Sequence, residues 1–184
     1  MLPRRWLVTD ERRLSDPLSA IHRLQPGDGV LFRHYGLPRA RRLALARQVA
    51  ALCRQHGVWF LVGGDIQLAR AVGADGLHLP QGLIACAAGA RRTGLTLVTA
   101  AAHDAGAVAR AARAGVDAVL LSPVFATASH PGAAALGPLR FAALATAARL
   151  RGMQVYAMGG IGPATLGRLR SLPLVGFAAI GALS

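Results

Sequence analysis

The chain alternates between two kinds of segment along its length, and this alternation constrains the fold more than any other feature. Short apolar runs of strand length recur, and segments rich in Ala, Leu and Arg with helical spacing lie between them. Such alternation is typical of a parallel sheet covered by helices. The expected strands are residues 6–8, 29–32, 58–62, 76–79, 96–100, 118–122, 155–158 and 177–180. The expected helices are residues 16–24, 39–56, 66–72, 83–92, 105–114, 139–150 and 164–169.

Eight strands alternating with helices predict an α/β protein with a compact (β/α)8 TIM barrel, a fold that usually takes about 250 residues. Only seven helices are expected, so the last helix would be absent or truncated after Ser184. A homodimer partner or a slightly open barrel would then cover the uncovered flank. An open doubly wound sheet shows the same alternation and is the main structural alternative.

A short internal repeat favours the barrel. Residues 71–77 read Ala-Val-Gly-Ala-Asp-Gly-Leu, and residues 112–119 repeat this arrangement with one extra residue. In both copies the glycine would end a helix in the left-handed conformation, and the aspartate would cap the following turn. Two units built alike indicate a repeated architecture.

Length and composition predict a single domain over residues 1–184, in which 53% of the side chains are hydrophobic. Arg or Asp interrupts every apolar stretch before it approaches the roughly 20 residues of a spanning helix. The first residues lack the pattern of a secretory signal. We therefore expect a cytoplasmic protein with no membrane partner. Cys53 and Cys86 lie in expected helices and are interpreted as two buried thiols, with no disulfide or metal cluster.

The formal net charge of +13 indicates an attraction for anions. The arginines fall mostly within expected helices and lack interleaved aromatic residues, so we interpret them as solvated helix faces. No nucleic-acid partner is expected. The nucleic-acid alternative would predict binding that weakens steeply with salt.

Glycines at the ends of the last two expected strands predict a phosphate-binding site. In such a barrel the loops after the carboxyl ends of the strands form the working face. Gly159 and Gly160 follow the seventh strand, and Gly181 and Ala182 follow the eighth. Loops without side chains at these places allow backbone N–H groups to close around a phosphate.

Other strand ends carry polar candidates. The loop after the sixth strand holds Thr127, Ser129 and His130, whose donors could reach an anionic ligand. Residues 33–35 after the second strand read Arg-His-Tyr, and His34 is either part of a cationic cluster suited to an anionic heterocycle or part of a surface turn. His78 is expected to pack inside the barrel. The sequence contains neither the Cys/His spacing of a zinc site nor the motif of a serine hydrolase.

Taken in order, the motifs resemble those of the thiamine phosphate synthase and thiazole tautomerase family, and their spacing matches along nearly the full chain. The matching segments are Trp6-Leu7-Val8-Thr9-Asp10, Val72-Gly73-Ala74-Asp75-Gly76-Leu77-His78-Leu79 with Gln81, Gly115-Val116-Asp117, Ser122-Pro123-Val124-Phe125 with Thr127 and Gly137, and Tyr156-Ala157-Met158-Gly159-Gly160-Ile161.

This resemblance implies an enzyme that joins hydroxymethylpyrimidine diphosphate to a thiazole phosphate, releasing pyrophosphate with the help of Mg²⁺. It places the family's diphosphate-binding arginine on Arg33 and its loop lysine on His130. The family's Asn-Asp pair falls on Gly63 and Gly64, which leaves the adjacent Asp65 as the candidate Mg²⁺ ligand. Fixed cations at these positions would stabilise the departing pyrophosphate.

The chain also departs from the transferase pattern. A family lysine is replaced near Tyr35, and an acidic residue is replaced around Gly82 and Leu83. The tautomerase branch needs a proton shuttle and no metal, and His103 matches the position of its histidine. The sequence therefore leaves three alternative functions: the transferase, a metal-free tautomerase using His103, and a non-catalytic ligand-binding relative. In each of them the expected partners are small phosphorylated heterocycles.

Overall fold

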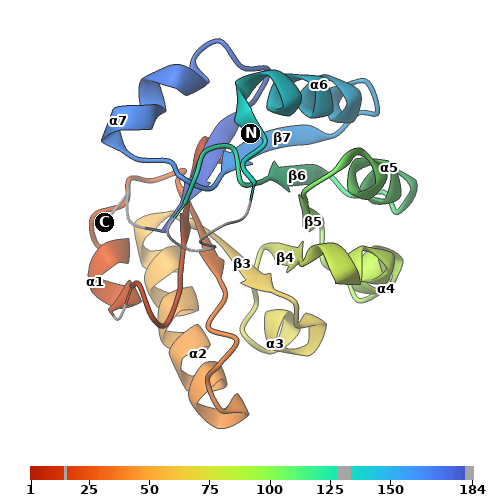
Figure 1. Ribbon diagram of the computed structural model, residues 1–184. Helices are drawn as coiled ribbons and strands as arrows, with labels where there is room; N and C mark the ends of the chain where they lie inside the picture. Colours follow the sequence, from red (N-terminus) through yellow and green to blue (C-terminus); the bar gives the residue numbers. More distant parts are fainter. Residues whose placement is uncertain (15, 128–133, 181–184) are drawn as a thin grey trace.

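Eight parallel strands form a closed barrel in chain order, with β1 paired to β8 (Figure 1). This computed structural model describes residues 1–14, 16–127 and 134–180. The predicted TIM barrel is confirmed, and the open doubly wound alternative is wrong because an open sheet does not pair its first strand with its last. The strands are β1 (Arg5–Val8), β2 (Gly29–Phe32), β3 (Trp59–Gly63), β4 (Gly76–Leu79), β5 (Leu97–Ala102), β6 (Ala118–Leu121), β7 (Gln154–Met158) and β8 (Gly176–Ala179).

Helices surround the barrel, and each lies between two consecutive strands in the sequence (Figure 1). The expected helix 83–92 begins as a tight 3-10 helix, and the expected helix 16–24 is shorter than predicted. Among the described residues no helix follows β8. The helices are α1 (Pro17–Ile21), α2 (Arg39–His56), α3 (Ile66–Ala71), η1 (Gln81–Cys86), α4 (Ala87–Arg92), α5 (Ala105–Arg113), α6 (Gly137–Arg149), α7 (Pro163–Leu166) and η2 (Gly167–Leu169).

The interior of the barrel is filled by a compact set of large and small side chains. The ring of Trp6 meets that of Tyr156 edge to face, with their centroids 6.1 Å apart. Gly29 lies opposite Trp6, and a Cβ at that glycine would overlap the indole ring. Small residues on some strands thus make room for large ones on others, as the layered interior of such a barrel requires.

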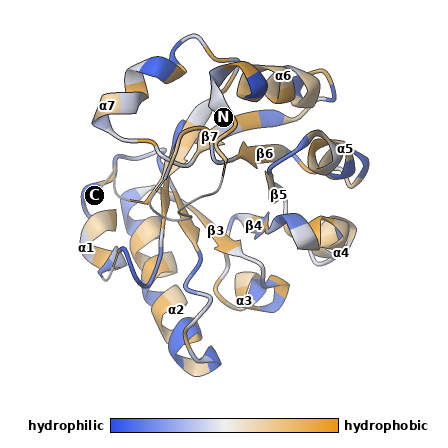
Figure 2. Cartoon of the chain, viewed as in Figure 1, coloured by the Kyte–Doolittle hydropathy of each residue, from blue (hydrophilic) through white to orange (hydrophobic). Residues whose placement is uncertain are grey.

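A second and larger core lies between the barrel and its helices. It includes Phe32, Val62 and Val98 from the strands, with Val49 from α2 and Phe141 from α6. Figure 2 shows the corresponding pattern, with apolar colour on the strands and polar colour on parts of the outer helices. Strands buried on both sides explain why the sequence shows short continuous apolar runs in place of alternation.

The internal repeat forms two equivalent helix-to-strand connections. Gly73 and Gly115 have φ values of +63° and +70°, so both end their helices in the left-handed conformation as predicted. The predicted turn-capping role of the aspartates is wrong. Asp75 accepts a hydrogen bond from the Phe60 N–H at 2.7 Å, and Asp117 accepts one from the Val98 N–H at 2.7 Å. Each aspartate therefore binds the start of the preceding strand in the barrel.

The two cysteines are both free but differ in environment. Cys53 is buried in the outer core, and burial raises the pKa of its thiol to about 12. Cys86 is exposed, which corrects the expectation that both thiols are buried. Within the described ranges, no helix is long and apolar enough to cross a membrane.

Candidate active site

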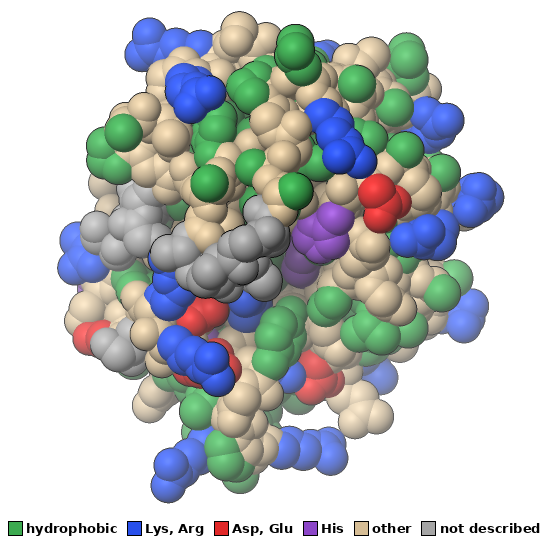
Figure 3. All heavy atoms as spheres, in the orientation of Figure 1, with side chains coloured by type: hydrophobic (Ala, Val, Ile, Leu, Met, Phe, Trp, Pro, Cys, Tyr) green, Lys and Arg blue, Asp and Glu red, His purple; other side chains and the backbone are tan. Residues whose placement is uncertain are grey.

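The carboxyl ends of the strands bring together most of the predicted site residues. Arginine and histidine side chains, with carboxylates beside them, gather around the centre of the face shown in Figure 3. Because the strands run parallel in a closed ring, loops far apart in the sequence meet at this end. Ser129, His130, Gly181 and Ala182 lie outside the described residues.

Gly159 and Gly160 line a pocket of about 210 Å³ at the ends of β7 and β8. The pocket lies where the sequence predicted a phosphate site, and the predicted binding residue Thr127 is also in its wall. We call this pocket the phosphate cradle; its walls are Arg13, Ala126, Thr127, Met158, Gly159, Gly160, Ile161, Ala178, Ala179 and Ile180.

Both the backbone conformation and the limited space around it require glycine at positions 159 and 160. Their φ values are +91° and +67°, in the left-handed region that favours glycine. A Cβ on Gly160 would lie 2.5 Å from the carbonyl oxygen of Ala126. The carbonyl of Gly159 accepts a hydrogen bond from the Phe125 N–H at 3.2 Å, and that of Gly160 accepts one from Thr165 Oγ1 at 2.8 Å. These bonds neutralise part of the negative charge that carbonyl oxygens would otherwise present to a bound anion.

Arg13 is a wall residue of the phosphate cradle that the sequence analysis missed. It belongs to the turn after β1, whereas the glycines follow β7. No local signal distinguishes Arg13 from its neighbour Arg12, since both are exposed arginines of one pair. Only the pairing of β1 with β8 places this turn beside the cradle.

Arg33 lies at the end of β2 in a partly buried setting. Its Nη2 is 3.4 Å from Asp10 Oδ2, and its guanidinium carbon lies 5.9 Å from the centre of the Tyr35 ring. The Nε of Arg33 is buried and has no hydrogen-bond partner among the described residues. An anion from solvent does not reach a buried Nε, so the attraction for an anion at this place comes from the positive charge of the guanidinium.

His34 packs beneath the site. Its side chain is buried, its ring stacks on Phe32 with centroids 5.0 Å apart, and its Nδ1 lies 2.8 Å from Thr9 Oγ1. Burial lowers the pKa of His34, and the nearby carboxylates of Glu11 and Asp10 oppose this shift. A buried neutral ring bonded to Thr9 supports the end of β2, in contrast to both the cationic cluster and the surface turn considered from the sequence.

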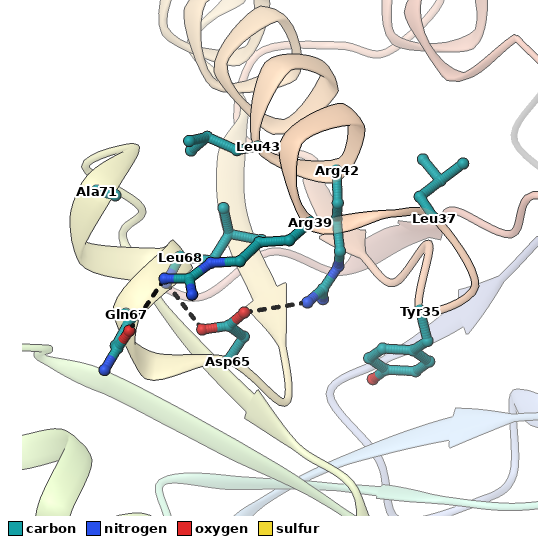
Figure 4. A pocket seen from close by; sticks show the side chains of 9 residues that line it. All are labelled: Tyr35, Leu37, Arg39, Arg42, Leu43, Asp65, Gln67, Leu68 and Ala71. Carbon is teal, nitrogen blue, oxygen red and sulfur yellow. Dashed lines mark hydrogen bonds and ion pairs between the residues drawn. The ribbon is translucent and has the colours of Figure 1, made fainter.

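Asp65 begins α3 and is bound on both of its carboxylate oxygens. Oδ1 accepts the Leu68 N–H at 2.9 Å, and Oδ2 pairs with Arg42 Nη1 at 3.2 Å (Figure 4). Within the described ranges, His, Cys, Asp and Glu form no group of three that could hold a metal ion. Asp65 therefore does not fit the role of a Mg²⁺ ligand unless it gives up these partners.

Arg42 connects the ends of β2 and β3, and the sequence analysis also missed it. Its Nη2 donates to the carbonyl oxygens of Gly63 at 2.8 Å and Arg33 at 3.1 Å. In the sequence it is one of several arginines at the start of α2, so residue type alone does not reveal this role. Arg42 also borders a hollow of about 480 Å³ between α2 and α3, on the outer side of the barrel (Figure 4).

His103 follows β5 and is exposed. Its Nδ1 lies 2.7 Å from the carbonyl oxygen of Ser122, which can only accept a hydrogen bond. The proton of the neutral ring therefore sits on Nδ1, and Nε2 carries the lone pair of a base. Gln81 accepts the His103 N–H at 2.9 Å and so connects the loops after β4 and β5.

His78 packs inside the barrel, as predicted. Its Nδ1 is 2.9 Å from Thr99 Oγ1, and its side chain is buried. Burial lowers the pKa of His78 to about 3, and the charge of Arg33 adds to this effect. The ring is therefore neutral at physiological pH and belongs to the core beneath the site.

The chain is similar in sequence to known proteins of thiamine biosynthesis. The chain is 38% identical over 169 residues to a bifunctional thiamine biosynthesis protein of Symbiobacterium thermophilum, covering 90% of this chain but 33% of that protein. It is 39% identical over 145 residues to a thiamine-phosphate synthase of Chromobacterium violaceum, covering 78% of this chain and 68% of the relative. The chain thus spans about a third of the first relative and about two thirds of the second.

Solved structures confirm the fold. A thiamine phosphate pyrophosphorylase from Pyrococcus furiosus superposes with a TM-score of 0.83 at 19% identity, covering 98% of this chain and 87% of the other. Residues 6–183 match the family described as thiamine monophosphate synthase. The family suggested by the motif order is therefore confirmed, and the chain belongs to the thiamine monophosphate synthase family.

Proposed function

We propose that the chain is a transferase that joins hydroxymethylpyrimidine diphosphate to a thiazole phosphate and releases pyrophosphate. A carbon–nitrogen bond forms between the two heterocycles, and the bond from the pyrimidine methylene carbon to the diphosphate oxygen breaks. The electron pair of the broken bond leaves with pyrophosphate. The similarity of the chain to thiamine-phosphate synthases supports this reaction class.

The observation that carries the proposal is the presence of two anion-accepting places at the same end of the barrel. The phosphate cradle lies at the ends of β7 and β8. Arg33 lies at the end of β2, where the charge of its partly exposed guanidinium side chain suits a diphosphate. Two phosphorylated substrates bound at these places would direct their heterocycles toward the middle of the barrel end.

Leaving-group stabilisation is the chemical task that this arrangement has to perform. Negative charge grows on the pyrophosphate as the carbon–oxygen bond breaks, and a guanidinium held in position lowers the energy of that charge. Asp10 and the Tyr35 ring hold Arg33, so the cation is oriented before the substrate arrives. Arg33 thus takes the role of pyrophosphate-stabilising residue in the proposal.

Mg²⁺ is not assigned to protein ligands in this proposal. The carboxylate of Asp65 caps α3 and pairs with Arg42, and the described residues place no group of three His, Cys, Asp or Glu side chains where a metal ion could bind. Asp65 would have to give up one of these partners to bind the ion. Asp65→Asn keeps an oxygen for the helix cap and removes the negative charge. We expect product formation by this variant to depend on the Mg²⁺ concentration in the same way as product formation by the wild-type protein.

The test is formation of thiamine phosphate from the two purified precursors, with and without Mg²⁺. Arg33→Ala is expected to lower kcat/KM by about 100-fold or more, since removal of one donor to a developing charge has that effect. Arg41→Ala is the matched control, because Arg41 is exposed on α2, and it should behave as wild type. Absence of product from folded wild-type protein would refute the transferase.

A metal-free thiazole tautomerase is the second candidate, and the geometry of His103 favours it. The Ser122 carbonyl holds the proton of the neutral ring on Nδ1 and leaves Nε2 as the base. Under this alternative, His103→Asn abolishes interconversion of the thiazole carboxylate tautomers, followed by ultraviolet absorbance in the presence of a chelator. Tautomerisation unaffected by this variant would exclude the role of His103. Binding of thiazole phosphate without either turnover would instead identify a non-catalytic relative.

A further inference from the structure

We infer that Arg13 supplies the cation of the phosphate cradle and makes the pocket selective for ligands that end in a phosphate group. This inference rests on the proposed function and deepens it by naming a specificity residue. Arg13 lines the same pocket as Gly159 and Gly160, although its turn comes from the opposite end of the chain.

The backbone of the turn after β1 holds Arg13 in place. The carbonyl oxygen of Asp10 accepts the N–H groups of Arg13 at 3.3 Å and Leu14 at 2.9 Å. The carboxylate of Asp10 also accepts the Arg12 N–H at 3.1 Å. The side chain of Leu14 packs against the outer core. Three consecutive residues, Arg12 to Leu14, are thus bound through their backbone to Asp10, so the backbone of the turn that carries Arg13 is held in place.

Closure of the barrel places the turn after β1, which carries Arg13, next to the end of β8. β1 pairs with β8 in parallel, with Trp6 opposite Ala178 and Leu7 opposite Ala179. The residues that follow β1 therefore emerge beside the carboxyl end of β8. The wall of the cradle contains Ala178 and Ala179 themselves. Arg13 thus approaches the cradle from the β1 side, across β8 from the two glycines.

Within the described wall of the cradle, the full positive charge comes from Arg13. Its other wall residues are Ala, Gly, Ile, Met and Thr, so Arg13 is the single charged member of the described wall. Backbone N–H groups alone carry partial charges, whereas a guanidinium can bind a phosphate through two parallel hydrogen bonds. Without Arg13, the described wall would offer no full positive charge to balance a phosphate.

Calorimetric titration with thiazole phosphate, in the absence of the pyrimidine substrate, tests the inference. Arg13→Ala is expected to weaken binding by about 10- to 100-fold, the usual effect of losing a hydrogen bond to a charged group. Binding of the dephosphorylated thiazole alcohol should stay the same. Arg12→Ala removes an equal charge from the same turn outside the cradle wall, and it should change binding by about twofold or less.

Equal weakening by Arg12→Ala and Arg13→Ala would overturn the inference, because a general surface charge would then explain both. Weakened binding of the alcohol would also overturn it, since the effect would not involve the phosphate. Arg13→Lys should recover part of the lost affinity. The two proposals fail separately: binding that depends on Arg13 without turnover refutes only the transferase, and turnover with an unchanged KM for thiazole phosphate in Arg13→Ala refutes only the role of Arg13.

Discussion

Individual side chains at the carboxyl end of the barrel divide into those bound to the scaffold and those that face the site. His34, His78 and Arg42 are bound to Thr9, Thr99 and backbone carbonyls, respectively. Arg13 lines the cradle, and Arg33 retains a donor without a partner among the described residues. The three arginines Arg13, Arg33 and Arg42 therefore perform different tasks.

His78 predicts how stability changes with pH. Its ordinary pKa of 6.5 falls to about 3 in the folded protein because the ring is buried. Below pH 6.5 the unfolded chain binds a proton that the folded chain does not, so the free energy of unfolding falls as the pH is lowered toward 3. The slope from this one group approaches about 1.4 kcal/mol per pH unit.

Urea unfolding of the wild type and of His78→Gln between pH 7 and pH 4 measures this contribution. The variant removes the titrating group and keeps a side chain that can bond to Thr99. Its stability should fall less steeply with acid than that of the wild type. Parallel pH profiles for the two proteins would show that His78 is not the buried neutral group described here.

At the scale of elements, the internal repeat is a device that connects neighbouring strands. Gly115 ends α5, and Asp117 then binds the first part of β5 through its side chain and its backbone. The N–H of Asp117 donates to the Val98 carbonyl at 2.9 Å, while its carboxylate accepts the Val98 N–H. The same pair of bonds joins Asp75 to Phe60. Each aspartate thus helps to set the register between two adjacent strands.

Asp117→Ala is expected to lower the free energy of unfolding by about 1–3 kcal/mol, because the Val98 N–H loses its acceptor. Asp117→Asn retains an acceptor oxygen and loses only the charge that pairs with Arg91 at 2.7 Å. The asparagine variant should therefore be clearly more stable than the alanine variant in urea unfolding. If both variants lower the free energy of unfolding equally, the stabilisation by Asp117 comes from its ion pair with Arg91 and not from its hydrogen bond to the Val98 N–H.

At the scale of the whole molecule, closure between β1 and β8 completes both the core and the cradle. The Phe177 N–H donates to the Arg4 carbonyl oxygen at 2.9 Å across this seam. Gly176 lies so close to Arg4 that a Cβ would overlap its carbonyl oxygen. The first and last strands therefore meet only because the last one begins with glycine.

Gly176→Ala is expected to lower the free energy of unfolding by about 1–3 kcal/mol, because backbone must move to accept the methyl group. Thermal unfolding followed by circular dichroism provides the measurement. Gly167→Ala is the matched control, since a Cβ there meets no atom within 4 Å. If the Gly176→Ala protein is as stable as this control, the close approach between Gly176 and the Arg4 carbonyl oxygen is contradicted.

The sequence by itself determined the order of eight strands and their helices, because short apolar runs alternating with helical segments are a local pattern that burial on both sides of each strand imposes. The pairing of β1 with β8, which distinguishes the barrel from an open sheet, came from the tertiary structure. It also located the glycines of the cradle, since a left-handed backbone restricts the residue type. Residues such as Arg13 and Arg42 carried no such signal, because an arginine on a helix or a turn looks the same whether it faces solvent or a site. Only the tertiary structure decided their roles, since closure of β1 on β8 places Arg13 in the wall of the same pocket as Gly159, and the ends of β2 and β3 provide the carbonyls that bind Arg42.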